Sequence, residues 1–395
     1  MEAYLLDWVN LLLRWTHVIV AIAWIGSSFY FVWLDNSLRA PVSEELKKMG
    51  VGGELWAVHG GGFYNPQKYL GAPPKLPEDL HWFYWESYST WLSGFGLFSV
   101  LYLFNPKVFL IDPSVANISP AVAVIAALAF LAVGWLVYDS LCRLLQNREK
   151  LLAVLVVLYV VAASWAACHL FAGRAAFLII GAMIATIMSA NVFFWIIPGQ
   201  RKVVAAMKAG QPVDPIHGKR GKQRSVHNTY FTLPVLFAML SNHYNMTYSH
   251  PHNWLVLVMI MVAGVLVRQF FILRHKGVVN FAYPAVAIAI LAGVAAWIAP
   301  ASPAKTDAQA AKGVEFGQVQ QIVQARCVQC HSAQPTLMPS APKGLMYDQP
   351  DAIKASAQLI YQQVVVQKAM PLGNLTHMTD EERSVIGKWF EAGAK

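Results

Sequence analysis

Charged residues are scarce in this chain: they form 13% of its 395 residues, while 56% are hydrophobic. Soluble globular domains carry about 25% charged residues. The composition therefore excludes an ordinary soluble enzyme and indicates a protein that crosses a membrane several times.

Cysteine is also scarce, with four residues in the whole chain. Cys142 and Cys168 lie in apolar runs far upstream of Cys327 and Cys330. The four therefore cannot form a four-cysteine zinc site. The chain also lacks the paired histidines of a haem-copper oxidase core, because the segment His250-Pro251-His252 falls in a loop between apolar runs.

Residues 1–299 contain eight apolar runs long enough to span a membrane. The first run lacks a small-residue cleavage site and is followed by further runs, so it is expected to remain as a helix rather than to be removed as a signal peptide. The sixth run is the shortest and contains Pro234. The predicted spans are roughly 9–34, 83–104, 120–141, 151–171, 174–197, 227–242, 253–274 and 279–299.

Lysine and arginine are distributed unequally between the connections. Seventeen lie in the first, third, fifth and seventh connections, and two lie in the second, fourth and sixth. Cytoplasmic connections carry the excess of Lys and Arg, so both termini are expected in the periplasm of a bacterial inner membrane. The net charge of +9 is then explained by topology and by membrane lipid headgroups, and no nucleic-acid partner is expected.

The stretch Cys327-Val328-Gln329-Cys330-His331 has the spacing of covalent c-type haem attachment. Cys327 and Cys330 can bond the haem vinyl groups, and His331 can ligate the iron. Met370 is the expected second axial ligand, with Met338 as a rival and Met346 and Met378 as weaker candidates. A redox dithiol is the alternative interpretation of the two cysteines.

The predicted fold class is therefore all-α. Residues 1–299 form a polytopic helical membrane domain of about eight transmembrane helices, and 300–313 form a flexible linker rich in Ala and Pro. Residues 314–395 form a small, periplasmic helical domain resembling a class I cytochrome c.

Ionisable residues inside a membrane span are functional candidates by default. His17 in the first run is expected either to ligate a haem b, with His243 as a possible second ligand, or to bond a neighbouring helix. Gly26 and its serine neighbours would let a backbone or a flat cofactor come close. Arg268 in the seventh run is expected either to be a buried charge or to snorkel toward the cytoplasmic surface.

The first connection, 35–82, is too long for a simple tether. Its segment 56–69 places the glycines 60–62 among aromatic residues, with His59 and Lys68 nearby. A phosphate loop would require a following Lys-Ser/Thr pair, which is missing. A planar, polar, possibly anionic ligand fits this composition, and a packed interfacial loop is the alternative. His81 and Glu86, at the start of the second run, are further candidates for proton transfer.

The tract from Trp56 to Tyr69, the stretch 85–94, His227-Asn228-Thr229-Tyr230 and the stretch 240–244 resemble the membrane-bound bacterial urate oxidases. These are urate hydroxylases with a membrane domain followed by a cytochrome c domain, and the resemblance covers essentially the whole chain. It implies oxidation of urate to 5-hydroxyisourate, with electrons passing to the fused haem and on to a periplasmic cytochrome or terminal oxidase. The family's cytochrome ligands carry over to Cys327, Cys330, His331 and Met370.

Two functional hypotheses follow. In the first, urate binds at the first connection, where Lys68 balances its charge and His59, His81 or Glu86 moves protons. That placement separates urate from haem c by a hydrocarbon core of about 30 Å, which a haem b on His17 and His243 would bridge; a site reached from the periplasm would need no relay. In the second hypothesis, the membrane part only transfers electrons from quinol or a partner dehydrogenase to the cytochrome.

Overall fold

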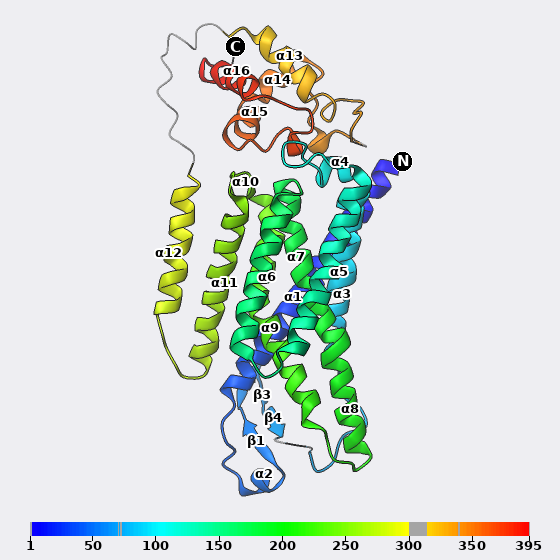
Figure 1. Cartoon of the computed structure of the whole chain (residues 1–395), viewed down its shortest axis with the longest axis vertical. Helices are drawn as coiled ribbons and strands as arrows, with labels where there is room; N and C mark the ends of the chain where they lie inside the picture. Colours follow the sequence, from blue (N-terminus) through cyan, green and yellow to red (C-terminus); the bar gives the residue numbers. More distant parts are fainter. Residues whose placement is uncertain (1, 70, 72, 300–313, 339, 395) are drawn as a thin grey trace.

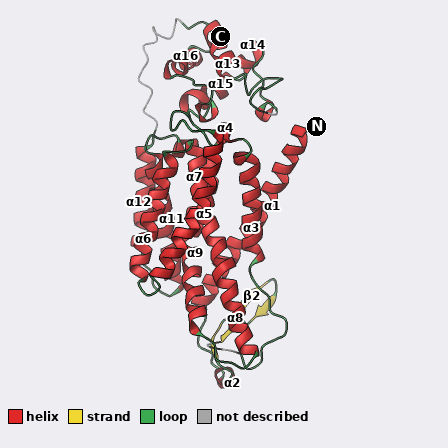
Figure 2. Cartoon of the chain, turned by 45° about the vertical axis from the view of Figure 1, so that its right-hand side comes forward, coloured by secondary structure: helices red, strands yellow, loops and turns green. Residues whose placement is uncertain are grey.

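The computed structural model describes residues 2–69, 71, 73–299, 314–338 and 340–394. It shows a long helical body with a small helical domain at one end, as Figures 1 and 2 show. The predicted linker, 300–313, lies outside the described residues.

Each of the eight predicted runs overlaps a helix of the body. Two of these helices continue through short π-helical segments, η1 (Ser99–Leu103) after α3 and η2 (Asn191–Ile196) between α7 and α8. The helices are α1 (Glu2–Ser37), α3 (Trp85–Phe98), α5 (Pro120–Leu144), α6 (Glu149–Cys168), α7 (Gly173–Ala190), α8 (Ile197–Lys208), α9 (Pro215–Leu240), α11 (Asn253–His275) and α12 (Ala282–Trp297).

Five helical stretches among the described residues are long and apolar enough to cross a membrane. They correspond to α1, α5, α6, the continuous helix from α7 through α8, and α11. These five helices confirm the prediction of a mostly helical protein with several helices that could span a membrane. The full number of eight remains a prediction, because α3 and α12 are shorter and α9 is more polar.

Helix α9 begins at Pro215, twelve residues before the predicted sixth run. The side chain of Asp214 accepts a hydrogen bond from the backbone N–H of Ile216 at 2.9 Å, and Pro215 occupies the first helical turn. Both features favour a helix start. The polar residues that follow therefore extend the helix beyond its apolar part.

The first connection is not helical throughout, which departs from the all-α prediction. After the short helix α2 (Glu44–Lys48), strand β1 (Val51–Glu54) pairs antiparallel with β4 (Gln67–Tyr69), and β2 (Ala57–His59) pairs with β3 (Gly62–Tyr64). Gly60 and Gly61 turn the inner hairpin with φ of 57° and 79°, a conformation that glycine adopts without steric cost.

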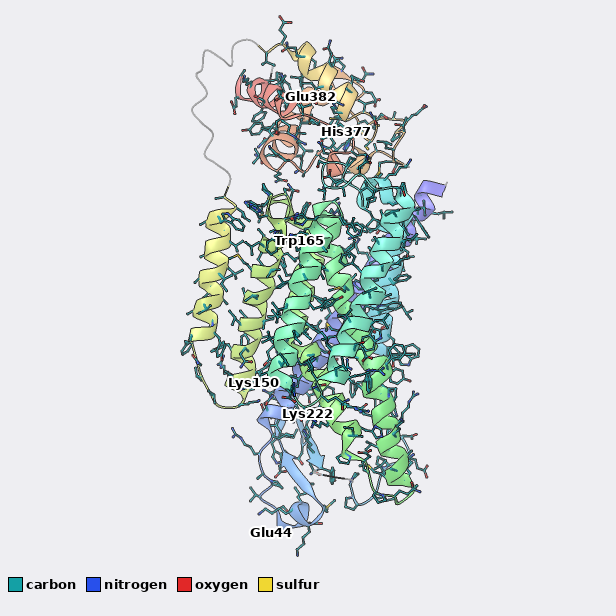
Figure 3. All side chains as sticks on the ribbon, in the orientation of Figure 1. Glu44, Lys150, Trp165, Lys222, His377 and Glu382 are labelled. Carbon is teal, nitrogen blue, oxygen red and sulfur yellow. The ribbon has the colours of Figure 1, made fainter. Side chains whose placement is uncertain are left out.

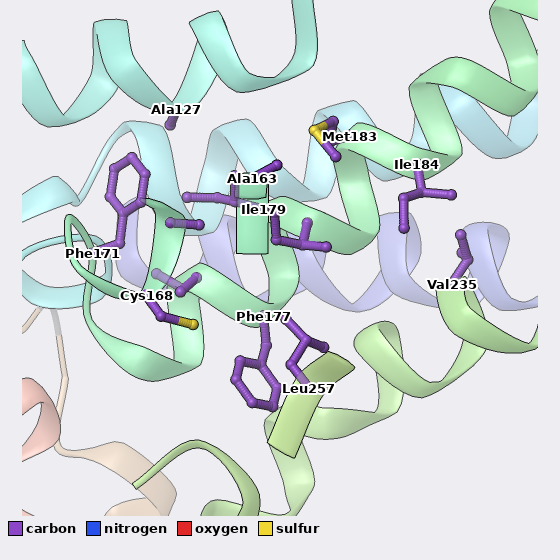
Figure 4. Close-up of a cluster of buried hydrophobic side chains, with 14 of the residues drawn as sticks. Ala127, Ala163, Cys168, Phe171, Phe177, Ile179, Met183, Ile184, Val235 and Leu257 are labelled. Carbon is purple, nitrogen blue, oxygen red and sulfur yellow. The ribbon is translucent and has the colours of Figure 1, made fainter. Parts of the chain in front are cut away.

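The hydrophobic core of the body surrounds α7. Six large α7 side chains are at most 1% exposed, and they pack against residues of α5, α6, α9 and α11; Figure 4 shows several of them. A Cβ built at Gly134 of α5 would lie 2.4 Å from Cγ of Met183. Close packing of α5 on α7 therefore requires glycine at this position. The six large buried side chains of α7 are Phe177, Ile179, Ile180, Met183, Ile184 and Ile187.

The connections separate into two ends of the molecule. Glu44, Lys150 and Lys222, from the first, third and fifth connections, lie toward one end, whereas Trp165 lies toward the other (Figure 3). The N-terminus and the small domain are at the second end (Figure 1). This arrangement agrees with the predicted grouping of connections, while the compartment that each end faces remains a prediction.

The small domain has its own hydrophobic core, in which Ile386 and Trp389 of the last helix are at most 1% exposed. Two shorter helical segments, η6 (Tyr361–Val366) and η7 (Leu372–Asn374), precede that helix. Thr379 and Glu382 form a reciprocal capping box at its start, which satisfies two helix N-terminal donors. The α-helices are α13 (Phe316–Arg326), α14 (Pro350–Ala355), α15 (Ala357–Ile360) and α16 (Asp380–Glu391).

Candidate functional site

The Cys-x-x-Cys-His segment forms a tight turn directly after α13. The backbone N–H groups of Cys330 and His331 both donate to the carbonyl oxygen of Cys327, at 3.1 and 2.8 Å. Nδ1 of His331 lies 3.1 Å from the carbonyl oxygen of Leu345. A carbonyl can only accept, so Nδ1 carries the proton and Nε2 keeps the lone pair that a metal requires. His331 therefore presents an unprotonated ring nitrogen that could bind a metal ion.

The two thiols of the segment do not have the electrostatics of a redox dithiol. Burial raises the pKa of Cys327 to about 12, and burial also raises the pKa of Cys330. Reactive Cys-x-x-Cys pairs have lowered thiol pKa values. The burial of both thiols therefore argues against the redox dithiol alternative.

Met370 lies at the rim of the small domain's core, packed against the same cluster as Cys327 and Val328. Arg383 fixes this segment by donating from Nη1 to the carbonyl oxygens of Met370 at 2.7 Å and Val364 at 2.5 Å.

The other methionines described after His331 suit a ligand role less well. Met378 is 4% exposed inside the core, and Met346 is 47% exposed. Half-buried Met338 lies outside the core cluster. Of the four, Met370 is the one that is partly buried and packed against the same cluster as Cys327, and its role as an axial ligand remains a prediction.

Arg326, the residue before Cys327, ties this segment to α16. Its Nε lies 3.0 and 3.1 Å from the two carboxylate oxygens of Glu382. Burial alone would raise the pKa of Glu382, but the hydrogen bonds from Arg326 and from the Thr379 N–H, with the nearby positive charge, hold that pKa below its ordinary value.

We predict that Glu382→Gln destabilises the small domain by about 1 kcal/mol at pH 7. A carboxyl with a lowered folded-state pKa stabilises the fold above its unfolded pKa of about 4.3, and this contribution is lost as pH falls through the folded pKa. Hydrogen–deuterium exchange of α13 and α16 peptides at pH 7 should be faster in the variant. Equal exchange rates in the wild type and the variant at pH 7 would contradict this prediction. A difference between them near pH 2.5 as large as at pH 7 would contradict the dependence of stability on the Glu382 charge.

The four residues proposed for urate chemistry have separate neighbours. Lys68 pairs with the exposed carboxylate of Asp35, and His59 is exposed at the end of β2. His81 packs edge-on against Phe83 with ring centroids 4.5 Å apart. Glu86 lies half-buried in the first turn of α3. Among the described residues, no hydrogen bond or ion pair joins these four into one group.

His17 connects α1 to α3. Its Nδ1 lies 3.2 Å from the carbonyl oxygen of Thr90 and 3.1 Å from Oγ of Ser93. A Cβ built at Gly94 would lie 2.9 Å from Cε1 of His17, so the ring packs directly on that glycine. These contacts match the predicted bond to a neighbouring helix. His243 is exposed in η3 (Ser241–His243) after α9, and no described contact joins it to His17.

A buried polar network between α5, η2 and α9 was not predicted. Asp139 accepts hydrogen bonds from Nη2 of Arg224 at 2.6 Å, Nε1 of Trp195 at 2.7 Å and Nε of Arg143 at 2.7 Å. Arg224 is 2% exposed. The sequence signal for this network was Asp139, a single carboxylate within the apolar third run. A carboxylate inside a membrane usually pairs with another group, so a partner could have been expected.

The network continues through further polar side chains of α5, η2 and α9. Asn191 donates to Tyr138 at 3.1 Å and to Asn228 at 2.8 Å, and the Tyr138 hydroxyl lies 2.8 Å from Nδ1 of His227. Each of these groups is therefore hydrogen-bonded, and a satisfied buried network of this kind holds helices in one arrangement.

Arg268 of α11 is the second buried cation of the body, at 4% exposure. Its guanidinium lies over the Phe29 ring of α1, 4.1 Å from the centroid. Snorkelling, one of the two predicted alternatives, would place this group in water. The structure therefore supports the buried alternative.

Comparison with known proteins supports the urate oxidase part of the resemblance drawn from the sequence and does not test the cytochrome c part. No curated protein and no solved structure matched the chain. A family model described as urate oxidase N-terminal matches residues 3–299, which is more than half of the chain. On this match, the protein belongs to the urate oxidase N-terminal family.

Proposed function

We propose that this protein oxidises urate to 5-hydroxyisourate and transfers the electrons to a c-type haem in its own C-terminal domain. The observation that carries the proposal is the joining, in one chain, of a urate oxidase N-terminal region at 3–299 to a Cys-x-x-Cys-His turn with His331 prepared for a metal. The reaction balances as urate plus water giving 5-hydroxyisourate, two protons and two electrons.

The residues present fit a c-type haem. Cys327 and Cys330 would hold it covalently, and His331 and Met370 would ligate its iron. When bound there, the haem accepts electrons one at a time.

The contact between the two parts of the chain supports this transfer. The side chain of Asn245 donates to the carbonyl oxygen of Gln367, and a Cβ built at Gly373 would lie 3.3 Å from the carbonyl oxygen of Ile111. Met370 stands in sequence between Gln367 and Gly373. The segment that carries the proposed axial ligand therefore lies against the helical body.

Reduction of the purified protein by urate tests the proposal. We expect the reduced c-type α-band to appear when urate is added without quinol, because the electrons come from the substrate itself. A protein that stays oxidised with urate but is reduced by quinol would be an electron-transfer module, and the proposed urate chemistry would be wrong.

A further inference from the structure

Arg268 is a buried cation without a counter-charge. It lies seven residues before the end of α11 at His275, about 10 Å along the helix. Its Nε and Nη2 are buried without a hydrogen-bond partner, and no carboxylate of the described residues forms a salt bridge with it. A buried charge that lacks a partner is strongly destabilising, so this arrangement calls for an anionic partner from outside the chain.

The unpaired atoms are on one edge of the guanidinium. Nε and Nη2 point the same way and bind two adjacent acceptors at once. Arg326 uses this edge in the same protein: its Nε and Nη2 hold the Glu382 carboxylate at 2.9 to 3.1 Å. Arg224, the other buried arginine of the body, is satisfied by Asp139 and Asn191. Arg268 therefore has two adjacent N–H donors, Nε and Nη2, for which the described residues supply no acceptor.

The surroundings of Arg268 are polar and aromatic. Tyr230 of α9 donates to Oε1 of Gln269, which leaves the Gln269 amide N–H groups as donors. Tyr230 and His275 both lie within electrostatic range of Arg268, and Nδ1 of His275 is also buried without a partner. Phe29 of α1 and Tyr230 of α9 thus bring two further helices to Arg268 and Gln269 of α11.

The shape of the cluster favours a planar ligand. Phe29 covers one face of the guanidinium, so a ligand on the free edge would lie in the guanidinium plane. The end of α11 is the end of the body that carries the first connection (Figure 1).

We propose that Arg268 is the anion-binding residue for urate, with Gln269 and His275 beside it. This inference rests on the proposed function. Urate at neutral pH is a planar monoanion in which a deprotonated ring nitrogen adjoins a carbonyl oxygen, so it offers two adjacent acceptors to Nε and Nη2. The amide of Gln269 can donate to a further carbonyl oxygen. The substrate thereby supplies the missing counter-charge, which the exposed Lys68 was expected to supply.

Direct binding of radiolabelled urate to the full-length protein in phosphatidylcholine nanodiscs tests this assignment. Arg268→Gln should weaken binding about tenfold to a hundredfold, the range for losing charge-assisted hydrogen bonds. Arg268→Lys keeps the positive charge but loses the paired Nε and Nη2 donors, so it should also bind urate more weakly than the wild type. Arg274→Gln, at an exposed arginine on the same helix, is the matched control and should bind urate normally.

Thermal unfolding of the same samples separates a binding role from a structural one. Without urate, Arg268→Gln should be at least as stable as the wild type, because it removes an unpaired buried charge. Urate should raise the Tm of the wild type and leave that of Arg268→Gln nearly unchanged. A ligand-free Arg268→Gln that is less stable than the wild type would mark Arg268 as structural and overturn the assignment.

Three outcomes distinguish this inference from the proposed function. Wild-type protein that neither binds urate nor is reduced by it would refute the function itself. Wild-type binding that Arg268→Gln leaves unchanged would refute the role of Arg268 alone. Stabilisation of the wild type by phosphatidylglycerol nanodiscs that is lost in Arg268→Gln, together with unchanged urate binding, would assign Arg268 to a lipid phosphate and equally overturn the proposal.

Discussion

Replacing Cys327 and Cys330 together with Ala is expected to abolish covalent haem and, with it, all urate-dependent electron transfer. Both thiols belong to the turn that brings His331 next to its Leu345 partner, and thioether attachment has no other cysteines in the small domain to use. Haem staining of a denaturing gel measures the first loss, and urate consumption with an artificial electron acceptor measures the second.

Cys168→Ala is the matched control for this double replacement. Cys168 is a buried thiol in an apolar part of the helical body, so its variant should keep haem and activity. Urate consumption that persists in the Cys327→Ala, Cys330→Ala protein would show that the cytochrome domain is dispensable for the reaction.

Removing Arg224 is expected to have the largest effect on stability. Arg224→Met leaves Asp139 at the centre of a buried network with one of its two charged partners gone. Breaking a buried ion pair by removing one partner costs about 3–5 kcal/mol. Thermal unfolding in detergent, followed by size-exclusion chromatography of the surviving folded fraction, measures the loss.

Lys47→Met provides the comparison for Arg224→Met. Lys47 pairs with Glu44 on the exposed helix α2, and exposed pairs contribute about 0–1 kcal/mol. Equal losses from the two variants would mean that the Asp139–Arg224 pair does not hold α5 and α9 together. Because the network is already satisfied, its expected role is to fix the helices around the substrate region rather than to bind substrate.

The helical architecture was accessible from the sequence because it depends on local patterns. Each apolar run overlaps a helix. The Cys-x-x-Cys-His spacing drew attention to the segment that forms the turn after α13, and its haem remains a prediction. The start of α9 was missed because its first twelve residues are mostly polar and do not form an apolar run; the cue was Asp214-Pro215, a helix start. The hairpins of the first connection were missed although Gly60-Gly61 marks a turn.

The polar centres of the body depend on contacts between distant residues, which no local pattern encodes. Asp139 and Arg224 are 85 residues apart in the chain. Phe29, in the first helix of the body, packs against Arg268 in α11. Composition drew attention to the first connection because His59 and Lys68 lie close together in sequence. The structure instead shows Lys68 paired with Asp35, whereas the buried Arg268 forms no salt bridge within the part of the chain that the structure describes.

Anaerobic titration of the fully oxidised, purified protein with urate tests the central claim most directly. The one c-type haem proposed for each chain would accept one electron, and each urate releases two. We therefore predict that one urate reduces the c-type haems of two chains, with formation of 5-hydroxyisourate and without peroxide. Urate consumption without reduction of the haem, or reduction that requires added quinol, would contradict the account.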